Sequence, residues 1–409
     1  MNKLISIIIS LSMVMNFVSF PWQAATKINS SIHPNYQNTS DVASNNTVDL
    51  GITSKSAILI EAKSGKILYS KNETEELKPA SVTKIMTVLL CYDAIKAGKM
   101  NYEDTITISE HASSMGGSQC FFEAGETQTV YDIIKCIQIS SGNDAAVAMG
   151  EHIAGSEDEF VKLMNNKAKE LGMNNTNFEN ACGLDSPNHY TCALDIGIMS
   201  RELITKHPEI FEISTIWMDH IIHKTNKGEQ RFDLANTNKF LRQYTGANGL
   251  KTGYTSEAGY CMSGTATRDD ITLIAVIMGA DTKETRNSEV AKLLDYGFSK
   301  CEQYKDQDVL GNLDKIKIKG GTKEYLMIEA IKEHTFSIFN ESPDNIKKKL
   351  EISSSLKAPI KSGETVGYVV YYTDKEILSK IPIISIENIS KKTYSLSLGD
   401  LCNKYFVIE

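Results

Sequence analysis

Three short motifs place hydroxyl, amine and amide side chains at spacings that could support chemistry on an acyl group. The motifs are Ser81-Val-Thr-Lys84, Ser141-Gly-Asn143 and Lys251-Thr-Gly253. A serine hydroxyl beside a lysine amine supplies a nucleophile and a proton acceptor, which acyl transfer through a serine ester requires. Each pattern is weak alone, because Ser354-Ser-Leu-Lys357 also fits the first and Lys361-Ser-Gly363 fits a looser form of the third. The functional copy of each motif must therefore be recognised from the secondary structure in which it lies.

The first motif opens a predicted helix. Apolar residues recur at helical spacing over residues 85–95, and Gly98 is a natural stop. Ser81 is therefore expected in the first turn, with Lys84 on the same face. The alternative is an ordinary helix cap with a solvated lysine. Ser354 lies in a predicted strand-and-turn region, where residues three apart in the chain do not share a face.

The second motif is the loop between two predicted helices, 130–139 and 144–153, with Gly142 permitting a tight backbone. Such a loop can present the Ser141 hydroxyl and the Asn143 amide to a cleft. The alternative is a capping turn that starts the next helix, and both descriptions can hold at once.

The third motif lies on a predicted strand, 249–255, which strands 260–266 and 271–278 extend into an antiparallel meander. Lys251 and Thr252 are expected on an edge that faces the helices. Gly253 would leave room there for the backbone of a ligand. The alternative for Lys251 is an edge-strand lysine that discourages aggregation.

The motifs and their surroundings resemble the serine-type D-Ala-D-Ala carboxypeptidases of peptidase family S11, which are low-molecular-mass penicillin-binding proteins, and in particular the spore-former and clostridial branch. The resemblance covers roughly residues 55–300 and rests on segments 78–87, 140–146, 183–190, 236–238 and 248–255. It implies a hydrolase that removes the C-terminal D-alanine from peptidoglycan pentapeptide stems through a serine acyl-enzyme. β-Lactam antibiotics would acylate the same serine.

The roles of the acylating groups follow from their chemistry. Ser81 is the expected acyl-ester nucleophile and needs a base beside it. Lys84 can accept the proton only if it is neutral, which burial and the nearby charge of Lys251 would favour. Ser141 could relay a proton to the leaving amine, and Asn143 could orient Lys84 and bind the substrate amide.

The remaining residues are expected to bind substrate. Lys251 and Thr252 offer a charge and a hydroxyl to the terminal carboxylate, next to Gly253. The backbone N–H groups of Ser81 and Tyr254 are the expected oxyanion donors.

Two alternatives to the carboxypeptidase stay open. A class A β-lactamase needs a glutamate for deacylation, and Glu170-Leu-Gly-Met-Asn174 is a lookalike of that segment. Residues 160–171 read as an amphipathic helix that ends at Gly172, so Glu170 is expected on the surface. A non-catalytic penicillin-binding sensor or scaffold is the second alternative, although it would have no need of both Ser81 and Lys84.

The eight cysteines give no metal spacing, and although His220 and His223 have a spacing that some metal sites use, no metal or cofactor is predicted. Cys182 and Cys192 are close enough in sequence to pair outside the cell, and this pairing is left open. The His220-Ile-Ile-His223 segment is assigned a structural role. By resemblance, His189 and Tyr190 would line the cleft.

The 409-residue chain is long enough for two or three domains, and its net charge of −8 gives no reason to propose nucleic acid as a partner. Residues 1–25 read as an export signal, with an uncleaved anchor as the alternative, and 26–54 as a disordered spacer. The protein is therefore expected outside the cytoplasm, secreted or at the outer face of the membrane. Residues 305–393 read as a small β-sandwich and 394–409 as a tail.

The predicted fold class is α/β. Residues 55–300 are expected to form a penicillin-binding/β-lactamase-like transpeptidase fold, with helices on a five-stranded antiparallel sheet whose first hairpin pairs 57–60 with 67–69. Peripheral membrane association stays open, because the segment 396–407 is short and lacks a basic face.

Overall fold

The computed structural model describes residues 48–225, 228–353, 356–396 and 398. The predicted signal, most of the spacer, most of the tail and Ser354 lie outside these residues. Within them, no helix combines the length and apolarity needed to cross a bilayer. The end of the predicted spacer is ordered, since the Glu289 carboxylate accepts hydrogen bonds from the backbone and hydroxyl groups of Thr53 and Ser54.

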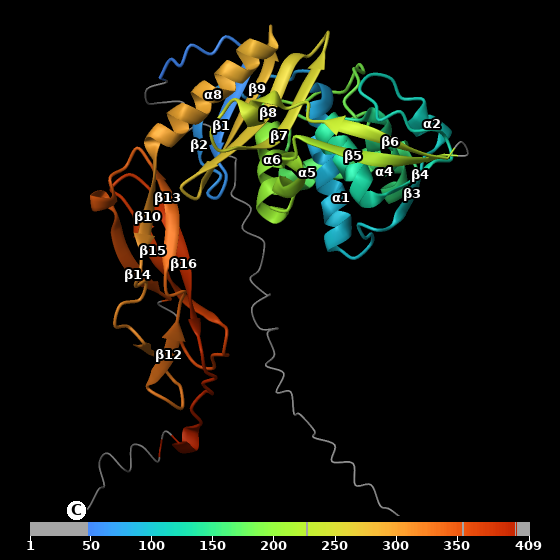
Figure 1. Cartoon of the computed structure of the whole chain (residues 1–409). Helices are drawn as coiled ribbons and strands as arrows, with labels where there is room; N and C mark the ends of the chain where they lie inside the picture. Colours follow the sequence, from blue (N-terminus) through green and yellow to red (C-terminus); the bar gives the residue numbers. More distant parts are fainter. Residues whose placement is uncertain (1–47, 226–227, 354–355, 397, 399–409) are drawn as a thin grey trace, which may run out of the picture. The chain divides into compact units, whose positions relative to one another are not determined.

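The central element is the predicted five-stranded antiparallel sheet, and its strand order is β2-β1-β9-β8-β7 (Figure 1). Its strands are β1 (Ser56–Glu61), β2 (Ile67–Lys71), β7 (Ala247–Thr255), β8 (Gly259–Arg268) and β9 (Ile271–Ala280). The third motif lies on β7, which is an edge strand. That edge is where Lys251 meets the helices.

Helices cover both faces of this sheet (Figure 1). Ala57 and Leu59 pack in one core with residues of helix α8 (Lys283–Lys300). Successive strand residues point to opposite faces, so Ile60 faces the other side, toward helix α6 (Ala193–Lys206). Gly197 of α6 comes so close that a Cβ there would lie 2.5 Å from Ile60 Cδ1. The sheet is thus held rigidly between two helical layers.

The remaining helices form the layer that carries the first two motifs. They are α1 (Lys84–Lys96), α2 (Glu110–Ser113), α3 (Val130–Lys135), α4 (Asn143–Ala154), α5 (Glu157–Leu171) and α7 (Ile210–Ser214). The predicted helix 130–139 is α-helical only to Lys135. A π-helical turn, Cys136–Ser140, follows it and ends at Ser141, whose φ of 62° is left-handed. This wider turn redirects the chain into the second motif.

Two two-stranded antiparallel sheets were missed by the sequence analysis. One pairs β3 (Thr105–Thr107) with β4 (Thr127–Thr129), and the other pairs β5 (Met218–Thr225) with β6 (Gly228–Ala235). The His220–His223 segment therefore lies on β5.

The C-terminal strands form a β-sandwich, as predicted. One sheet has the order β11-β12-β16-β15-β14, and β10 pairs with β13 in a second sheet. Side chains of both sheets meet in one hydrophobic core, among them Phe336, Val369 and Ile383. The strands are β10 (Cys301–Asp306), β11 (Lys315–Lys317), β12 (Tyr325–Glu329), β13 (His334–Phe339), β14 (Lys347–Ile352), β15 (Thr365–Tyr372) and β16 (Ile377–Ser385).

Candidate active site

Ser81 lies in a tight 3-10 turn, Ala80–Thr83, immediately before α1. Ala80 has a left-handed φ of 50°. Two glycines permit neighbouring segments to press against this turn: a Cβ on Gly183 would overlap the Ala80 carbonyl oxygen, and a Cβ on Gly253 would lie 2.9 Å from the Ser81 nitrogen. The nucleophile's backbone is therefore fixed from two sides, by a loop and by strand β7.

Lys84 is fully buried, and its amine has three oxygen neighbours. Nζ lies 2.9 Å from Ser81 Oγ, 2.6 Å from Asn143 Oδ1 and 2.7 Å from the Cys182 carbonyl oxygen. Burial lowers the pKa of Lys84 from 10.5 to about 8, although Cys182, Asp144 and Cys120 act in the opposite direction. A minor fraction of the amine is thus neutral at pH 7, far more than for an ordinary lysine, and can accept a proton.

Lys251 and Ser141 form the second pair. Lys251 Nζ donates to Ser141 Oγ at 2.8 Å and to the Thr252 carbonyl at 3.0 Å. Lys251 is only 2% exposed, so it is not a solvated edge-strand lysine. Burial, then the charges of Lys84 and Arg286, lower its pKa well below the usual value. A bound anion would relieve this unfavourable cluster of cations.

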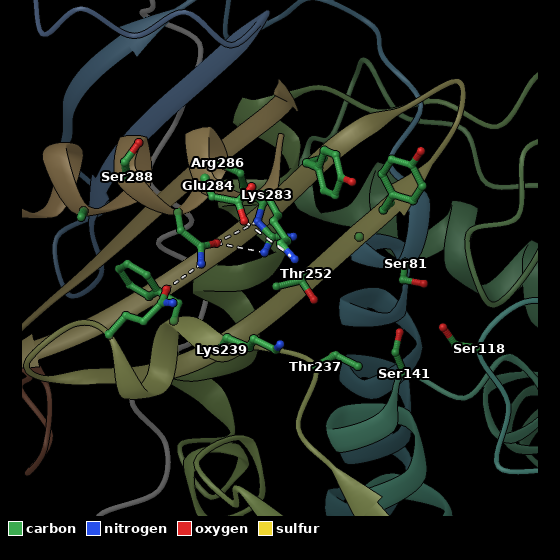
Figure 2. A pocket seen from close by; sticks show the side chains of 17 residues that line it. Ser81, Ser118, Ser141, Thr237, Lys239, Thr252, Lys283, Glu284, Arg286 and Ser288 are labelled. Carbon is green, nitrogen blue, oxygen red and sulfur yellow. Dashed lines mark hydrogen bonds and ion pairs between the residues drawn. The ribbon is translucent and has the colours of Figure 1, made fainter. Parts of the chain in front are cut away.

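Ser81, Ser141 and Thr252 line one cavity of about 800 Å³, together with Gly253 and Tyr254. Figure 2 shows Ser81 and Ser141 near one another, with Thr252 on the adjacent strand. The predicted convergence of the three motifs is therefore observed. Tyr254 is 56% exposed, and its ring contacts that of Tyr260 in a tilted arrangement, with centroids 4.4 Å apart.

Arg286 lines the cavity beyond Thr252 and was missed by the sequence analysis (Figure 2). Its buried guanidinium bonds to the amide oxygen of Asn287 at 2.9 and 3.0 Å. No ion pair to Arg286 is found among the described residues. It lies on α8, outside all three motifs, so no local pattern marks it. Lys239 and Lys283 extend the basic lining further along the cavity.

Asn143 already uses both ends of its amide group. Oδ1 accepts from Lys84, and Nδ2 donates to the Gly116 carbonyl at 2.6 Å. The orienting contact with Lys84 is thus present. A contact with the substrate amide would require Nδ2 to leave or share its bond to Gly116.

The expectation that His189 lines the cleft is wrong. His189 is buried behind the nucleophile turn, where Nδ1 accepts from the Glu179 N–H and Nε2 lies 2.9 Å from Thr83 Oγ1. Since Nδ1 accepts, Nε2 carries the hydrogen and donates to Thr83. Burial lowers its pKa to about 4. Tyr190 is half-buried, bridges to Asn177 and is likewise absent from the cavity lining.

His223, Cys182 and Cys192 lie in the interior of the domain. His223 Nδ1 lies 2.7 Å from the buried Glu126 carboxylate, an acidic partner that the sequence did not reveal. Cys182 and Cys192 are both free and buried. Across the part of the chain that the structure describes, no group of three or more His, Cys, Asp or Glu residues could hold a metal ion.

Two family models match the chain. One, described as D-alanyl-D-alanine carboxypeptidase, matches residues 41–282, and the other, the penicillin-binding protein 5 C-terminal domain, matches residues 298–391. The chain belongs to the D-alanyl-D-alanine carboxypeptidase family. The carboxypeptidase DacF of Bacillus subtilis is 43% identical over 348 residues, which are 84% of this chain and 88% of the relative.

Solved structures agree with this assignment. Penicillin-binding protein 5 of Haemophilus influenzae is 32% identical, with a TM-score of 0.71 over 83% of this chain and 98% of its own. Penicillin-binding protein D2 of Listeria monocytogenes, solved in an ampicillin-bound form, is 31% identical, with a TM-score of 0.52 over 61% of this chain and 100% of its own. The resemblance, the fold class and the enzyme class predicted from the sequence are thereby confirmed.

Proposed function

We propose that this carboxypeptidase hydrolyses the terminal D-Ala-D-Ala bond of peptidoglycan pentapeptide stems outside the cytoplasm, using Ser81 as its nucleophile. The observation that carries the proposal is the pair of contacts Lys84 to Ser81 and Lys251 to Ser141 beside one cavity. The family supports the reaction class, and the cavity chemistry supports the residue roles.

Acylation begins when neutral Lys84 accepts the proton of the Ser81 hydroxyl. Ser81 Oγ then forms a bond to the carbonyl carbon of the penultimate D-alanine. As the tetrahedral intermediate collapses, the C–N bond breaks, and the proton held by Lys84 passes through the Ser141 hydroxyl to the terminal D-alanine nitrogen. Since Ser141 Oγ contacts Lys251 Nζ at 2.8 Å, its hydroxyl is held at the edge of the reacting centre.

Water completes the reaction. Lys84, neutral again, accepts a proton from the water as it attacks the ester carbon; the bond to Ser81 Oγ breaks, and Oγ takes that proton from Lys84. The backbone N–H groups of Ser81 and Tyr254 stabilise the oxyanion in both steps; loss of one such donor typically costs about 3 kcal/mol.

The cations of the cavity account for the preference for a free carboxylate. Lys251 and Arg286 are both buried, and neither forms an ion pair with an acidic side chain among the described residues. Buried charges without partners are costly. A terminal carboxylate, held also by the Thr252 hydroxyl, completes this cluster.

β-Lactams fit the same reaction, because they present a strained amide and a carboxylate where the peptide would lie. The ampicillin-bound form of the Listeria relative supports this part of the proposal. A β-lactamase is disfavoured because the Glu170 side chain is 54% exposed and pairs with Lys167 on the surface. A sensor without activity is disfavoured by the complete acylating pair of Ser81 and Lys84.

The cellular role follows from the proposed substrate. Trimming of stem peptides contributes to cell-wall biogenesis and cell shape, and it requires export, for which residues 1–25 are the proposed signal. Attachment of the tail to the membrane surface is a separate and secondary proposal, because the segment 396–407 is short and lacks a basic face.

The decisive experiment incubates the purified protein with labelled penicillin and with a D-Ala-D-Ala-terminated peptide. The parent is expected to become labelled and to release D-alanine. Ser81→Ala is expected to abolish both, whereas Ser354→Ala, in the second S-x-x-K copy, leaves both unchanged. Persistent labelling of Ser81→Ala would refute the nucleophile assignment. Labelling without D-alanine release would instead favour the sensor.

A further inference from the structure

The turn formed by residues 180–184, here the 180–184 turn, contacts both members of the acylating pair. Its Cys182 carbonyl accepts from Lys84 Nζ, across 98 residues of sequence, and its Gly183 presses on the Ala80 carbonyl. We propose that this turn aims the neutral Lys84 amine at Ser81, and that Asn180 is the positioning residue that holds the turn. The inference rests on the proposed function and adds a residue that does not touch substrate.

Asn180 fixes three consecutive peptide groups. Its Oδ1 accepts from the backbone N–H of Cys182 at 3.2 Å, of Gly183 at 2.7 Å and of Leu184 at 3.1 Å. Its Nδ2 donates to the Leu184 carbonyl at 2.9 Å. Asn180 is half-buried and absent from the cavity lining. Its influence on the reaction must therefore pass through the turn.

The directions of hydrogen bonding at Lys84 explain why the turn matters. A neutral amine has two N–H donors and one lone pair, whereas the Asn143 Oδ1 and Cys182 carbonyl oxygens can only accept. These two acceptors, at 2.6 and 2.7 Å, occupy both donors. The lone pair is left facing Ser81 Oγ at 2.9 Å, where it can take the hydroxyl proton. Without the Cys182 carbonyl, an N–H could turn toward Ser81 instead.

The same turn supports the nucleophile. Gly183 has a φ of 88°, and besides the overlap with Ala80, a Cβ there would lie 2.9 Å from Thr83 Oγ1. Because Gly183 has no side chain, its Cα can pack directly against the peptide group between Ala80 and Ser81. The donor and the acceptor of the proton are both positioned by one turn, so a small shift of the turn changes their relative geometry. Misplacement of about 1 Å can cost on the order of 100-fold in rate.

The test compares Asn180→Ala with Asn188→Ala in the full-length protein. Asn188 lies on the same loop, is exposed, and bonds to Glu179 rather than to the 180–184 turn. Stopped-flow acylation by a chromogenic β-lactam gives the affinity of the initial complex and the limiting acylation rate. Titration with labelled penicillin gives the fraction of active sites.

Asn180→Ala is expected to lower the limiting acylation rate about 10- to 100-fold, with the affinity of the initial complex and the active fraction retained. Asn188→Ala should react within about twofold of the parent, as expected for an exposed surface residue. Asn180→Asp keeps an acceptor oxygen for the three N–H groups and should recover most of the rate. Its carboxylate should also move the acidic limb of the pH profile upward, since a negative charge favours protonated Lys84.

Three outcomes would overturn the inference: an unchanged rate in Asn180→Ala, a loss confined to the active fraction, or an equal loss in Asn188→Ala. Each of these leaves the proposed function intact, provided that the parent is labelled and Ser81→Ala is not. Failure of the parent to react would instead refute the proposed function itself.

Discussion

Lys84 and Lys251 are both buried lysines beside the same cavity, yet their neighbours differ. Lys84 contacts the Ser81 hydroxyl and two fixed acceptors, whereas Lys251 contacts the Ser141 hydroxyl and a backbone carbonyl. Burial is the largest cause of the lowered pKa at both sites. Burial alone therefore does not distinguish a proton acceptor from an anion binder.

The charges around each lysine make the distinction. Asp144 opposes the effect of burial at Lys84, which leaves its pKa at about 8, within reach of proton transfer. At Lys251 the neighbouring charges are those of Lys84 and Arg286, and they add to the effect of burial. We therefore propose that a substrate carboxylate binds at Lys251, and that Lys84 can accept a proton before any anion binds. Four predictions test this contrast.

The largest effect is expected at Lys84. Lys84→Met removes the proton acceptor while keeping the length of the side chain, so the acylation rate should fall about 1,000- to 10,000-fold. Lys357→Met, in the second S-x-x-K copy and exposed, is the matched control and should not change the rate. The measurement is the second-order rate constant for labelling by penicillin. A loss of less than tenfold in Lys84→Met would contradict the assignment of the base.

Removal of the Lys251 charge should weaken recognition of the carboxylate instead. Lys251→Met is expected to lower kcat/KM for a D-Ala-D-Ala peptide about 100-fold, the scale of a lost charged hydrogen bond. The matched control is Lys361→Met, in the exposed K-S-G copy. The parent should prefer the free acid strongly over the C-terminal amide. If Lys251→Met keeps the full preference, Lys251 does not bind the carboxylate.

The pH dependence should report Lys84. Because only the neutral amine accepts a proton, the acylation rate should rise about tenfold per pH unit below the pKa of about 8 and level off above it. Penicillin labelling rates between pH 6 and 9 test this. A flat profile across that range would assign the base elsewhere.

The same pKa has a consequence for stability. Between pH 8 and 10.5 the unfolded chain keeps the Lys84 proton that the folded chain has lost, so stability rises with pH in that window. Below pH 8 the cost of burying the charged amine is fully present. Lys84→Met should therefore be more stable than the parent at pH 7, and this advantage should shrink toward pH 10. Thermal unfolding at both pH values checks the sign.

No effect is expected at Glu170, which lies on the surface with Lys167. Glu170→Gln should leave the lifetime of the penicillin adduct within about twofold of the parent, as for surface substitutions in general. A markedly longer lifetime would mean that Glu170 serves deacylation, as in a class A β-lactamase.

The motif residues could be predicted from sequence because each motif coincides with a recognisable element. Lys84 begins a helix rich in apolar residues, and Lys251 lies on the first strand of a meander with clear turns. These local patterns were enough to predict the antiparallel sheet and the meeting of the three motifs at one site. The predicted helix 130–139 was only partly right, since the change to a π-helical turn at Cys136 has no simple periodic signature.

What sequence reasoning missed depends on contacts between distant segments. Arg286 reaches the cavity from α8, and the third neighbour of Lys84 is a backbone carbonyl, which any residue type at position 182 would supply. His189 was misplaced because both of its ring nitrogens are satisfied inside the domain, by Thr83 and the Glu179 N–H. A sequence shows which side chains exist, but not which face of a loop they occupy.

The most direct test of the central claim locates the covalent bond. The parent protein is reacted with penicillin, and its intact mass and proteolytic peptides are measured by mass spectrometry. One penicilloyl group per chain is expected, on the peptide that contains Ser81. An adduct on Ser141, on Ser354 or on any other residue would contradict the account.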